Sequence, residues 1–200
     1  MLWFLFFDEF ATSVRKSIQI GLNKCYDYKM FKIIFSLLLV FSFNSFALDI
    51  SSPAFNDGDN IPKKYGCKYN GGNNISIPLE FSDIPGDAKS LALIIDDPDA
   101  MSVAGKIWVH WILVDIPTNT KELKEVKDGK LGIGKTGRNS NGSKNYGGPC
   151  PPNGVHVYNI KVYALNIEIN KSLGEMTQKK FEKKYKNEII SSSMISGKYK

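Results

Sequence analysis

The sequence predicts a mostly-β domain with one late helix. Three apolar segments of strand length, residues 90–96, 107–116 and 155–169, follow one another along the chain, with polar or turn-forming residues between them. The one segment with helical spacing, residues 177–190, comes after all three. Strands followed by a late helix favour a mostly-β domain over a parallel βαβ sheet.

An N-terminal segment is best excluded from this domain. Residues 30–47 are typical of a secretory signal peptide, because Lys32 precedes the apolar run Ile33–Phe43 and small residues follow at a cleavage site ending in Ala47. The apolar run is shorter than the about 20 residues that a membrane-spanning helix needs, and an uncleaved anchor is the alternative.

Residues 1–29 fit no targeting pattern, and we interpret them as a leader that is not translated, with Met30 as the true start. The folded domain is therefore residues 48–200. We expect it to be periplasmic or secreted, with no stable membrane span after processing.

The first half of the domain carries the early strands. Residues 75–81 have strand character and end in a turn, and residues 90–96 form a continuous apolar run, as in a strand buried on both faces. Residues 107–116 form another strand, which Pro117 stops. The polar segment 121–145 is expected to form long loops with one short strand.

The second half carries the longest strand candidate, residues 155–169, and then the helix 177–190. Thr177 is the expected N-cap. An apolar residue recurs every four positions at Phe181, Tyr185 and Ile189, and marks the buried face. Residues 192–199 are expected to close the sheet as an edge strand.

Composition argues against a nucleic-acid-binding protein. The apolar share is 42% and the charged share 23%, as in ordinary globular proteins, and the net charge of the whole chain is +6. The lysines are scattered, with their densest run on the late helix, so they form no basic groove.

The domain keeps two of the three cysteines, Cys67 and Cys150. An even pair in an exported chain predicts one disulfide, worth roughly 4 kcal/mol in the chain-entropy account. Two unpaired buried thiols are the alternative. The spacing matches no metal motif such as Cys-x-x-Cys.

Both histidines of the chain lie in apolar strands. By strand alternation, His110 shares a face with Trp108, Ile112 and Val114. His156 likewise shares a face with the apolar or aromatic residues at 158, 160, 162 and 164. Each histidine is therefore expected to point inward, either as an ordinary core histidine or into a shared pocket.

Two further features could complete such a pocket. Asp97 and Asp99 follow directly on the apolar strand 90–96, where carboxylates reach a sheet rim, although a capped turn with solvated acids is the alternative. The segment 145–158 combines glycines, prolines, Cys150, a histidine and two tyrosines, and we interpret it as a rigid pocket wall. A stiff corner between strands is the alternative reading of that segment.

These side chains suit one of two ligand types. Asp97, His110, His156 and Tyr158 could receive an anion such as phosphate, and two histidines with an aspartate could equally bind a metal. No serine or cysteine sits in a nucleophile-elbow pattern. Residues 129–136 match the P-loop pattern letter for letter, but neither a buried strand before it nor a helix after it is expected, so nucleotide binding is rejected.

Three motifs in order resemble the phosphatidylethanolamine-binding protein family, and its bacterial Raf kinase inhibitor-like branch most of all. They are Asp97-Pro98-Asp99-Ala100, then Val109-His110-Trp111, then Tyr146-Gly147-Gly148-Pro149-Cys150-Pro151-Pro152, which leads to His156 and Tyr158. The resemblance spans about residues 49–199. It implies a large central antiparallel sheet, a smaller flanking sheet and a C-terminal helix.

The resemblance also implies a small pocket for phosphate-bearing head groups. The implied ligand-binding residues are Asp97, Asp99, His110, Gly148, Pro151, Pro152, His156 and Tyr158. A disulfide between Cys67 and Cys150 fits the bacterial branch. Two departures concern ligand identity: Met101 stands where the family usually has proline, and Val157 replaces a common arginine.

The leading hypothesis is a non-enzymatic, exported binding protein for a small anionic or phosphate-bearing ligand, with no cofactor and no metal. An alternative is a protein-level inhibitor of a protease or signalling kinase, which would use the segment 132–145 against its protein target. A third hypothesis is a metal-dependent hydrolase that uses His110, His156 and an aspartate.

Overall fold

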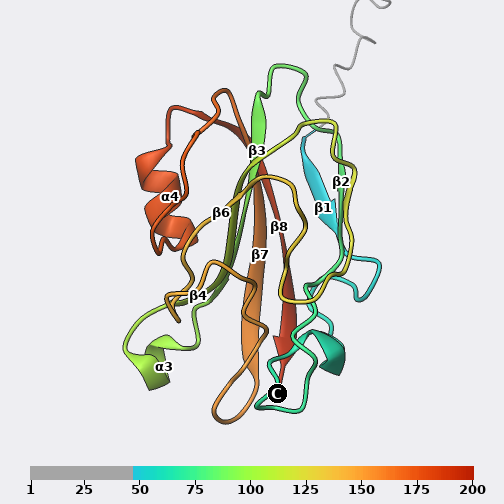
Figure 1. Ribbon diagram of the computed structural model, residues 1–200, viewed down its shortest axis with the longest axis vertical. Coiled ribbons are helices and arrows are strands. Elements are labelled where there is room, and N and C mark those ends of the chain that lie inside the picture. The colour runs from blue at the N-terminus through green and yellow to red at the C-terminus, as the bar shows by residue number, and fades with distance from the viewer. Residues whose placement is uncertain (1–46) are drawn as a thin grey trace, which may run out of the picture. The chain divides into compact units, whose positions relative to one another are not determined.

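The computed structural model describes residues 47–200, which build two antiparallel sheets (Figure 1). The larger sheet has the strand order β6-β4-β3-β7-β8, and the smaller has the order β1-β2-β5. The large-sheet strands are β3 (Ser90–Asp97), β4 (Trp108–Ile116), β6 (Lys135–Thr136), β7 (His156–Leu165) and β8 (Ile189–Tyr199); those of the small sheet are β1 (Asp49–Ser51), β2 (Leu79–Ser82) and β5 (Glu122–Leu123). The predicted fold class is confirmed.

Strand β3 is the centre of the large sheet. It pairs antiparallel with β4 on one side and with β7 on the other, and all eight of its residues are buried. A continuous apolar run suits this place, because both faces of the strand are covered. The prediction of a strand buried on both faces is confirmed.

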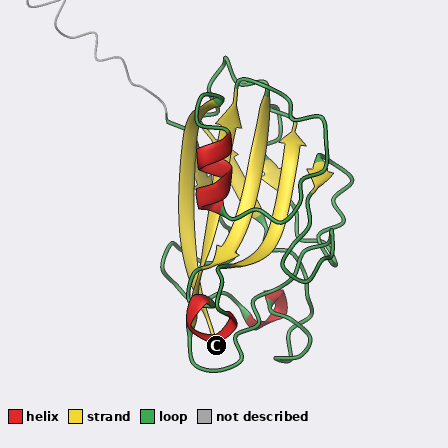
Figure 2. Ribbon diagram, turned by 90° about the vertical axis from the view of Figure 1, so that its left-hand side faces the viewer, coloured by secondary structure: helices red, strands yellow, loops and turns green. Residues whose placement is uncertain are grey.

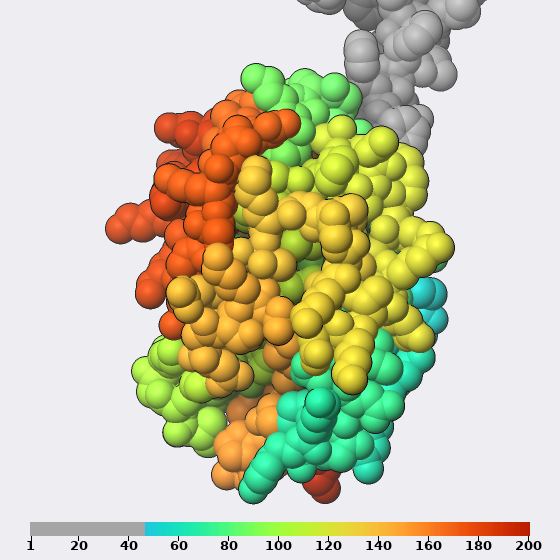
Figure 3. All heavy atoms as spheres, viewed as in Figure 1, coloured from blue at the N-terminus to red at the C-terminus, as the bar shows by residue number. Residues whose placement is uncertain are grey.

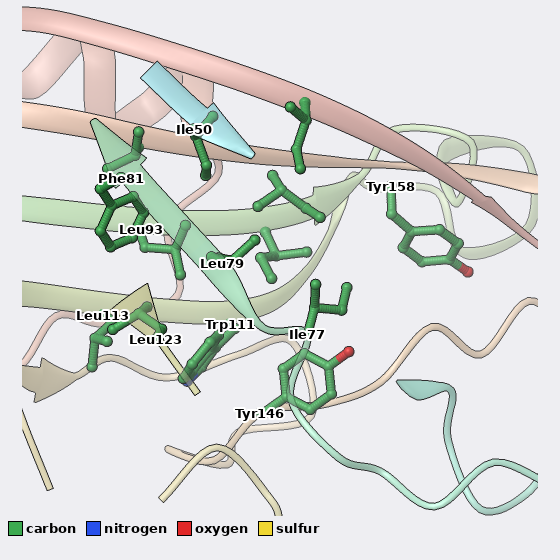
Figure 4. Packing of buried hydrophobic residues seen from close by; sticks show 14 of the residues in the cluster. Ile50, Ile77, Leu79, Phe81, Leu93, Trp111, Leu113, Leu123, Tyr146 and Tyr158 are labelled. Atoms are coloured by element: carbon green, nitrogen blue, oxygen red, sulfur yellow. The ribbon is translucent and has the colours of Figure 1, made fainter. Parts of the chain in front are cut away.

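Each face of the large sheet packs on its own apolar core. One core lies between the two sheets and includes Ile50, Phe81, Leu93 and Trp111 (Figure 4). The other lies under helix α4 (Gln178–Lys184), which covers the opposite face (Figures 1 and 2). Side-chain alternation along the strands supplies apolar residues to both cores.

Helix α4 is shorter than the predicted 177–190. Thr177 is its N-cap, because its hydroxyl accepts from the amide of Lys180 at 3.3 Å, and Phe181 is fully buried under it. The predicted continuation is wrong, because Ile189 begins β8 and pairs with Leu165. Pairing with a long neighbouring strand satisfies the backbone there, so the four-residue apolar spacing does not continue as helix.

Strand boundaries also differ from the sequence expectations. The strand expected at residues 75–81 forms only at β2, because Pro78 has no amide hydrogen to pair, and Ile75 makes a single bridge to Lys127. The loop segment 121–145 contains two short strands, β5 and β6, rather than one.

The last two strands of the large sheet are also bounded differently. Strand β7 is ten residues long and ends at Leu165, four residues before the expected end. Strand β8 has eleven residues and is the longest, and it lies at the sheet edge as predicted.

Short helical turns connect the strands near one end of the large sheet. These are η1 (Lys63–Tyr65) and α3 (Met101–Ala104). Residues 47–200 contain no helix with the length and apolar character needed to span a bilayer. The predicted leader, and all but the last residue of the predicted signal segment, lie outside the described residues.

Candidate functional site

A cavity of about 480 Å³ lies where β3 ends and where β4 and β7 begin. Because β3 runs antiparallel to both neighbours, its carboxyl end lies beside their amino ends. This pairing brings Asp97, His110 and His156, which are distant in sequence, to one cavity wall. Figure 3 shows this face of the molecule, with the segment 139–150 above α3 and residues 65–74 at the lower right.

A β-bulge directs His110 into the cavity. Ile95 pairs with Trp111, whereas the next residue, Asp96, pairs with Val109, so His110 is the extra residue of the ladder. A bulge turns a side chain away from strict alternation.

The alternation expected for His110 is therefore wrong in part. Ile112 and Val114 belong to the core under α4, whereas the His110 ring contacts Tyr158 of the other core. Trp108 does line the cavity with His110. His156 follows the prediction, since Tyr158, Ile160 and Val162 of its strand share the core between the sheets.

His156 and Asp97 form a buried pair. Nδ1 of His156 donates to Oδ2 of Asp97 at 2.7 Å, and the two side chains are 6% and 4% exposed. Oδ1 of Asp97 accepts from the amide of Ala100 at 3.0 Å, which ties the carboxylate to the corner before α3. The carboxylate orients the imidazole, so Nε2 is the ring nitrogen that His156 can offer to a ligand.

His110 is held differently, by backbone alone. Its Nδ1 lies 2.8 Å from the carbonyl oxygen of Gly147. A carbonyl only accepts hydrogen bonds, so Nδ1 carries the hydrogen and Nε2 of the neutral ring is a bare acceptor. Nε2 is buried and has no hydrogen-bond partner among the described residues. Burial is the main reason that the pKa of His110 lies below its ordinary value, so the ring is neutral at pH 7.

Tyr158 lies behind both imidazoles rather than in the cavity wall. Its ring meets that of His110 edge-on at 5.1 Å between centroids and stacks on that of His156 at 6.5 Å. Burial, and then the Asp97 carboxylate, raise the pKa of the Tyr158 phenol well above its ordinary value. Its hydroxyl is buried with no hydrogen-bond partner among residues 47–200, so the predicted ligand contact of Tyr158 stays a prediction.

The glycine-rich segment forms the opposite wall. Gly148 lies so close to residues 65–67 that a Cβ there would overlap the carbonyl oxygen of Tyr65. Its amide donates to the side-chain oxygen of Asn74 at 2.8 Å. A disulfide between Cys67 and Cys150 joins the same two segments, and both cysteines line the cavity.

Of the remaining predicted ligand-binding residues, one lines the cavity and two lie outside its wall. Pro152 lines the cavity. Asp99 does not, and its Oδ2 accepts from the amide of Val157 at 2.8 Å, which fastens the end of β3 to β7. Pro151 is buried outside the wall, and its carbonyl accepts from Asn70 at 2.9 Å.

Several wall residues were missed by sequence reasoning. An apolar side of the cavity comes from α3 and the start of β4, and polar side chains come from other loops; the residues are Asn74, Ala100, Val103, Ala104, Trp108, Asn139, Asn141, Ser143 and Tyr146. Alternation placed Trp108 on the face of His110, but Trp108 was not assigned to the site. The asparagines carried no signal, since they lie in loops whose path depends on distant contacts.

The segment 132–145 is a wall of the cavity rather than a detached loop. Oδ1 of the buried Asn139 accepts from the amides of Asn141 and Ser143, both at 3.0 Å. Deleting the tip of this segment would therefore alter the cavity as well as any surface for a protein target. Residues 129–136, which match the P-loop pattern, end in strand β6. A P-loop requires a helix at this place.

The cavity wall has little charge. Asp97 contributes a carboxylate, and no lysine or arginine of the described chain lines the cavity. Residues 47–200 also contain no group of three or more histidine, cysteine, aspartate or glutamate side chains placed to hold a metal ion. Among the described residues of the wall, His110 and His156 are the only ones with a basic side chain.

Comparisons with known proteins place this geometry in a family. The family model described as "Phosphatidylethanolamine-binding protein" matches residues 51–200. A UPF0098 protein of Aquifex aeolicus is 38% identical over 168 residues, which cover 80% of this chain and 93% of the relative. One of Methanothermobacter thermautotrophicus is 46% identical over 126 residues, or 62% of this chain and 80% of the relative.

Two crystal structures of other proteins resemble the structure of this chain. A phosphatidylethanolamine-binding protein homologue from Chlamydia trachomatis has a TM-score of 0.68 and 37% identity, and the match covers 78% of this chain and 99% of that one. Escherichia coli YbcL, described as a member of the mammalian family, has a TM-score of 0.67 and 27% identity, with 77% and 98% covered. The chain belongs to the phosphatidylethanolamine-binding protein family.

Proposed function

We propose that this protein is a non-catalytic binding protein whose cavity takes a small anionic group, such as a phosphate-bearing head group. The observation that carries the proposal is the convergence of His110, His156 and the Gly148 wall on one cavity of about 480 Å³. Imidazole nitrogens can present hydrogen-bond donors to an oxyanion. The apolar wall of α3 leaves room for an uncharged part of the same ligand.

Among the described residues that line the cavity, no cysteine is free to act as a nucleophile. The two cysteines that line it are joined in a disulfide, so neither is a thiolate. The buried phenol of Tyr158 keeps its proton at neutral pH. These features support binding rather than covalent catalysis.

Export from the cytoplasm is the second part of the proposal. It is supported by the signal-like pattern of residues 30–47 and by the Cys67–Cys150 disulfide, which suits an oxidising compartment. N-terminal sequencing of the native product checks it, and a mature end far from Leu48 would contradict it.

Calorimetric titration tests the anion site. Phosphoethanolamine and inorganic phosphate are titrated into wild type and into His156→Ala. We expect the variant to bind about 10- to 100-fold more weakly, because a hydrogen bond to a charged group contributes about 1.5–3 kcal/mol. Val155→Ala is the matched control, since this neighbouring side chain is exposed and lies outside the wall. Identical heats for wild type and His156→Ala would remove the pocket assignment.

A further inference from the structure

An oxyanion that enters this cavity meets an unusual set of groups. The wall holds the Asp97 carboxylate, and no described lysine or arginine offsets its charge. A buried anion is unfavourable unless it is paired or hydrogen-bonded. The imidazoles of His110 and His156 must therefore supply the hydrogen bonds or charge pairing that a lysine or arginine would otherwise give the anion.

The two imidazoles are not equivalent. His156 donates from Nδ1 to a side-chain carboxylate, that of Asp97. His110 gives its Nδ1 hydrogen to the carbonyl of Gly147, so its buried and unpartnered Nε2 offers only a lone pair. A lone pair on Nε2 repels a ligand oxygen unless a proton lies between the two atoms.

We propose that the cavity takes up its oxyanion together with one proton, held between an oxygen of the anion and Nε2 of His110. This inference rests on the proposed function and names its ligand class: oxyanions bound with one proton, of which phosphate monoesters are the example. A dianion draws the proton from solvent, whereas a monoanion of the same acid brings its own. No bond other than those to this proton is made or broken.

The groups around His110 favour it as the proton site. Strand β3 presents Asp97, β7 presents His156 and Tyr158, and the glycine-rich segment presents Tyr146. Burial raises the pKa of both tyrosines, so they stay protonated throughout. Asp97 favours a charged His110 and His156 disfavours it. The segment 67–74 and α3 add no side chain to the wall that titrates, because Cys67 is in the disulfide.

The sign of the pH dependence follows from this arrangement. Burial lowers the pKa of His110 in the free protein, and a bound anion raises it, so the complex holds the extra proton. Affinity for a dianion should therefore increase as the pH falls, by up to about tenfold per pH unit for one linked proton. The increase should stop once the free protein is itself protonated.

Proton uptake can be counted directly. Phosphoethanolamine is titrated at pH 7.0 in HEPES and in Tris, and the dependence of the binding heat on buffer ionisation enthalpy gives the protons taken up per anion. We expect about one proton for wild type and none for His110→Gln, because glutamine donates a hydrogen bond without titrating. Sulfate, which stays a dianion in this range, should show the same uptake as phosphoethanolamine.

The outcomes separate this inference from the proposed function. Binding without proton uptake by wild type, for either anion, would overturn the inference and leave the anion site standing. Uptake retained in His110→Gln would also overturn it, because the proton would lie elsewhere. The absence of any binding heat from pH 5.5 to 8 would remove the proposed function itself.

A measurement on wild type guards against a variant that does not fold. Nitrogen-15 NMR of histidine-labelled protein should show Nε2 of His110 changing from an unprotonated to a protonated shift when phosphoethanolamine is added at pH 7.0. An unchanged Nε2 shift at saturating anion would overturn the inference without any substitution.

Discussion

The side chains of two neighbouring aspartates point to opposite faces of the large sheet. Asp97 faces the cavity, whereas Asp96 points to the other side of the sheet and accepts from the amide of Gln178 at the start of α4, at 2.9 Å. Both residues are 3% exposed. Burial raises the pKa of Asp96 from 3.8 to about 6, with the amide of Gln178 opposing and Asp97 adding to the shift.

We expect Asp96→Asn to remove part of the pH dependence of stability. Because the folded-state pKa is the higher one, this group favours folding fully below about pH 3.8 and loses that contribution as the pH rises through about 6. The loss amounts to about 3 kcal/mol by pH 7, at 1.36 kcal/mol per pKa unit.

Urea unfolding at pH 4, 5, 6 and 7 measures this difference. The free energy of unfolding of wild type, relative to Asp96→Asn, should fall across the series. Glu168→Gln serves as the control, because its carboxylate lies on the surface outside the core clusters. Parallel pH profiles for wild type and Asp96→Asn would contradict the prediction.

The face of the sheet to which a side chain points was predictable only where the strand ladder is regular. Alternation placed His156 correctly, because β7 pairs without interruption from His156 to Ala164. It misplaced the companions of His110, because the bulge depends on how β3 and β4 pair and not on either sequence alone.

At the scale of elements, the glycine-rich wall depends on close approach between two segments. Gly148 packs against the backbone of residues 65–67, and its amide donates a hydrogen bond to the side-chain oxygen of Asn74. Backbone atoms on both sides leave no flexible side chain to move aside.

We expect Gly148→Ala to lower the free energy of unfolding by about 1–3 kcal/mol, as overpacking usually does, and to weaken phosphoethanolamine binding by displacing the wall. Urea unfolding and calorimetry measure the two effects. Gly86→Ala is the matched control, because a Cβ there meets nothing within 4 Å. Equal stability of the two variants would show that the wall is not tightly packed.

Elements were predicted best where apolar runs are continuous. Strands β3 and β4 appear close to their expected bounds, because burial on both faces gives a strong sequence signal. The helix end was wrong at Ile189, and β5 and β6 were poorly anticipated, since pairing with a distant strand decides those segments.

At the scale of the whole molecule, one covalent link joins the two walls of the cavity. The Cys67–Cys150 disulfide closes a span of 83 residues between the early loop and the glycine-rich segment. Such a link restricts the unfolded chain and so stabilises the folded one.

We expect the Cys67→Ser/Cys150→Ser double variant to lose about 4–5 kcal/mol of unfolding free energy in the chain-entropy account. Urea unfolding of the oxidised wild type and of the double variant measures it. A thiol reductant should destabilise wild type but leave the double variant unchanged. Similar stability of oxidised wild type and double variant would contradict the expected contribution of the link.

The sequence alone determined the mostly-β class, the central strand and the order of the motifs, because burial and local spacing act on neighbouring residues. Only the tertiary structure decided that the Gly147 carbonyl occupies Nδ1 of His110, that Nε2 is left without a partner, and that no described lysine or arginine reaches the cavity. These features arise from contacts between residues far apart in the chain, and hydrogen-bond geometry across such contacts leaves no local pattern in the sequence.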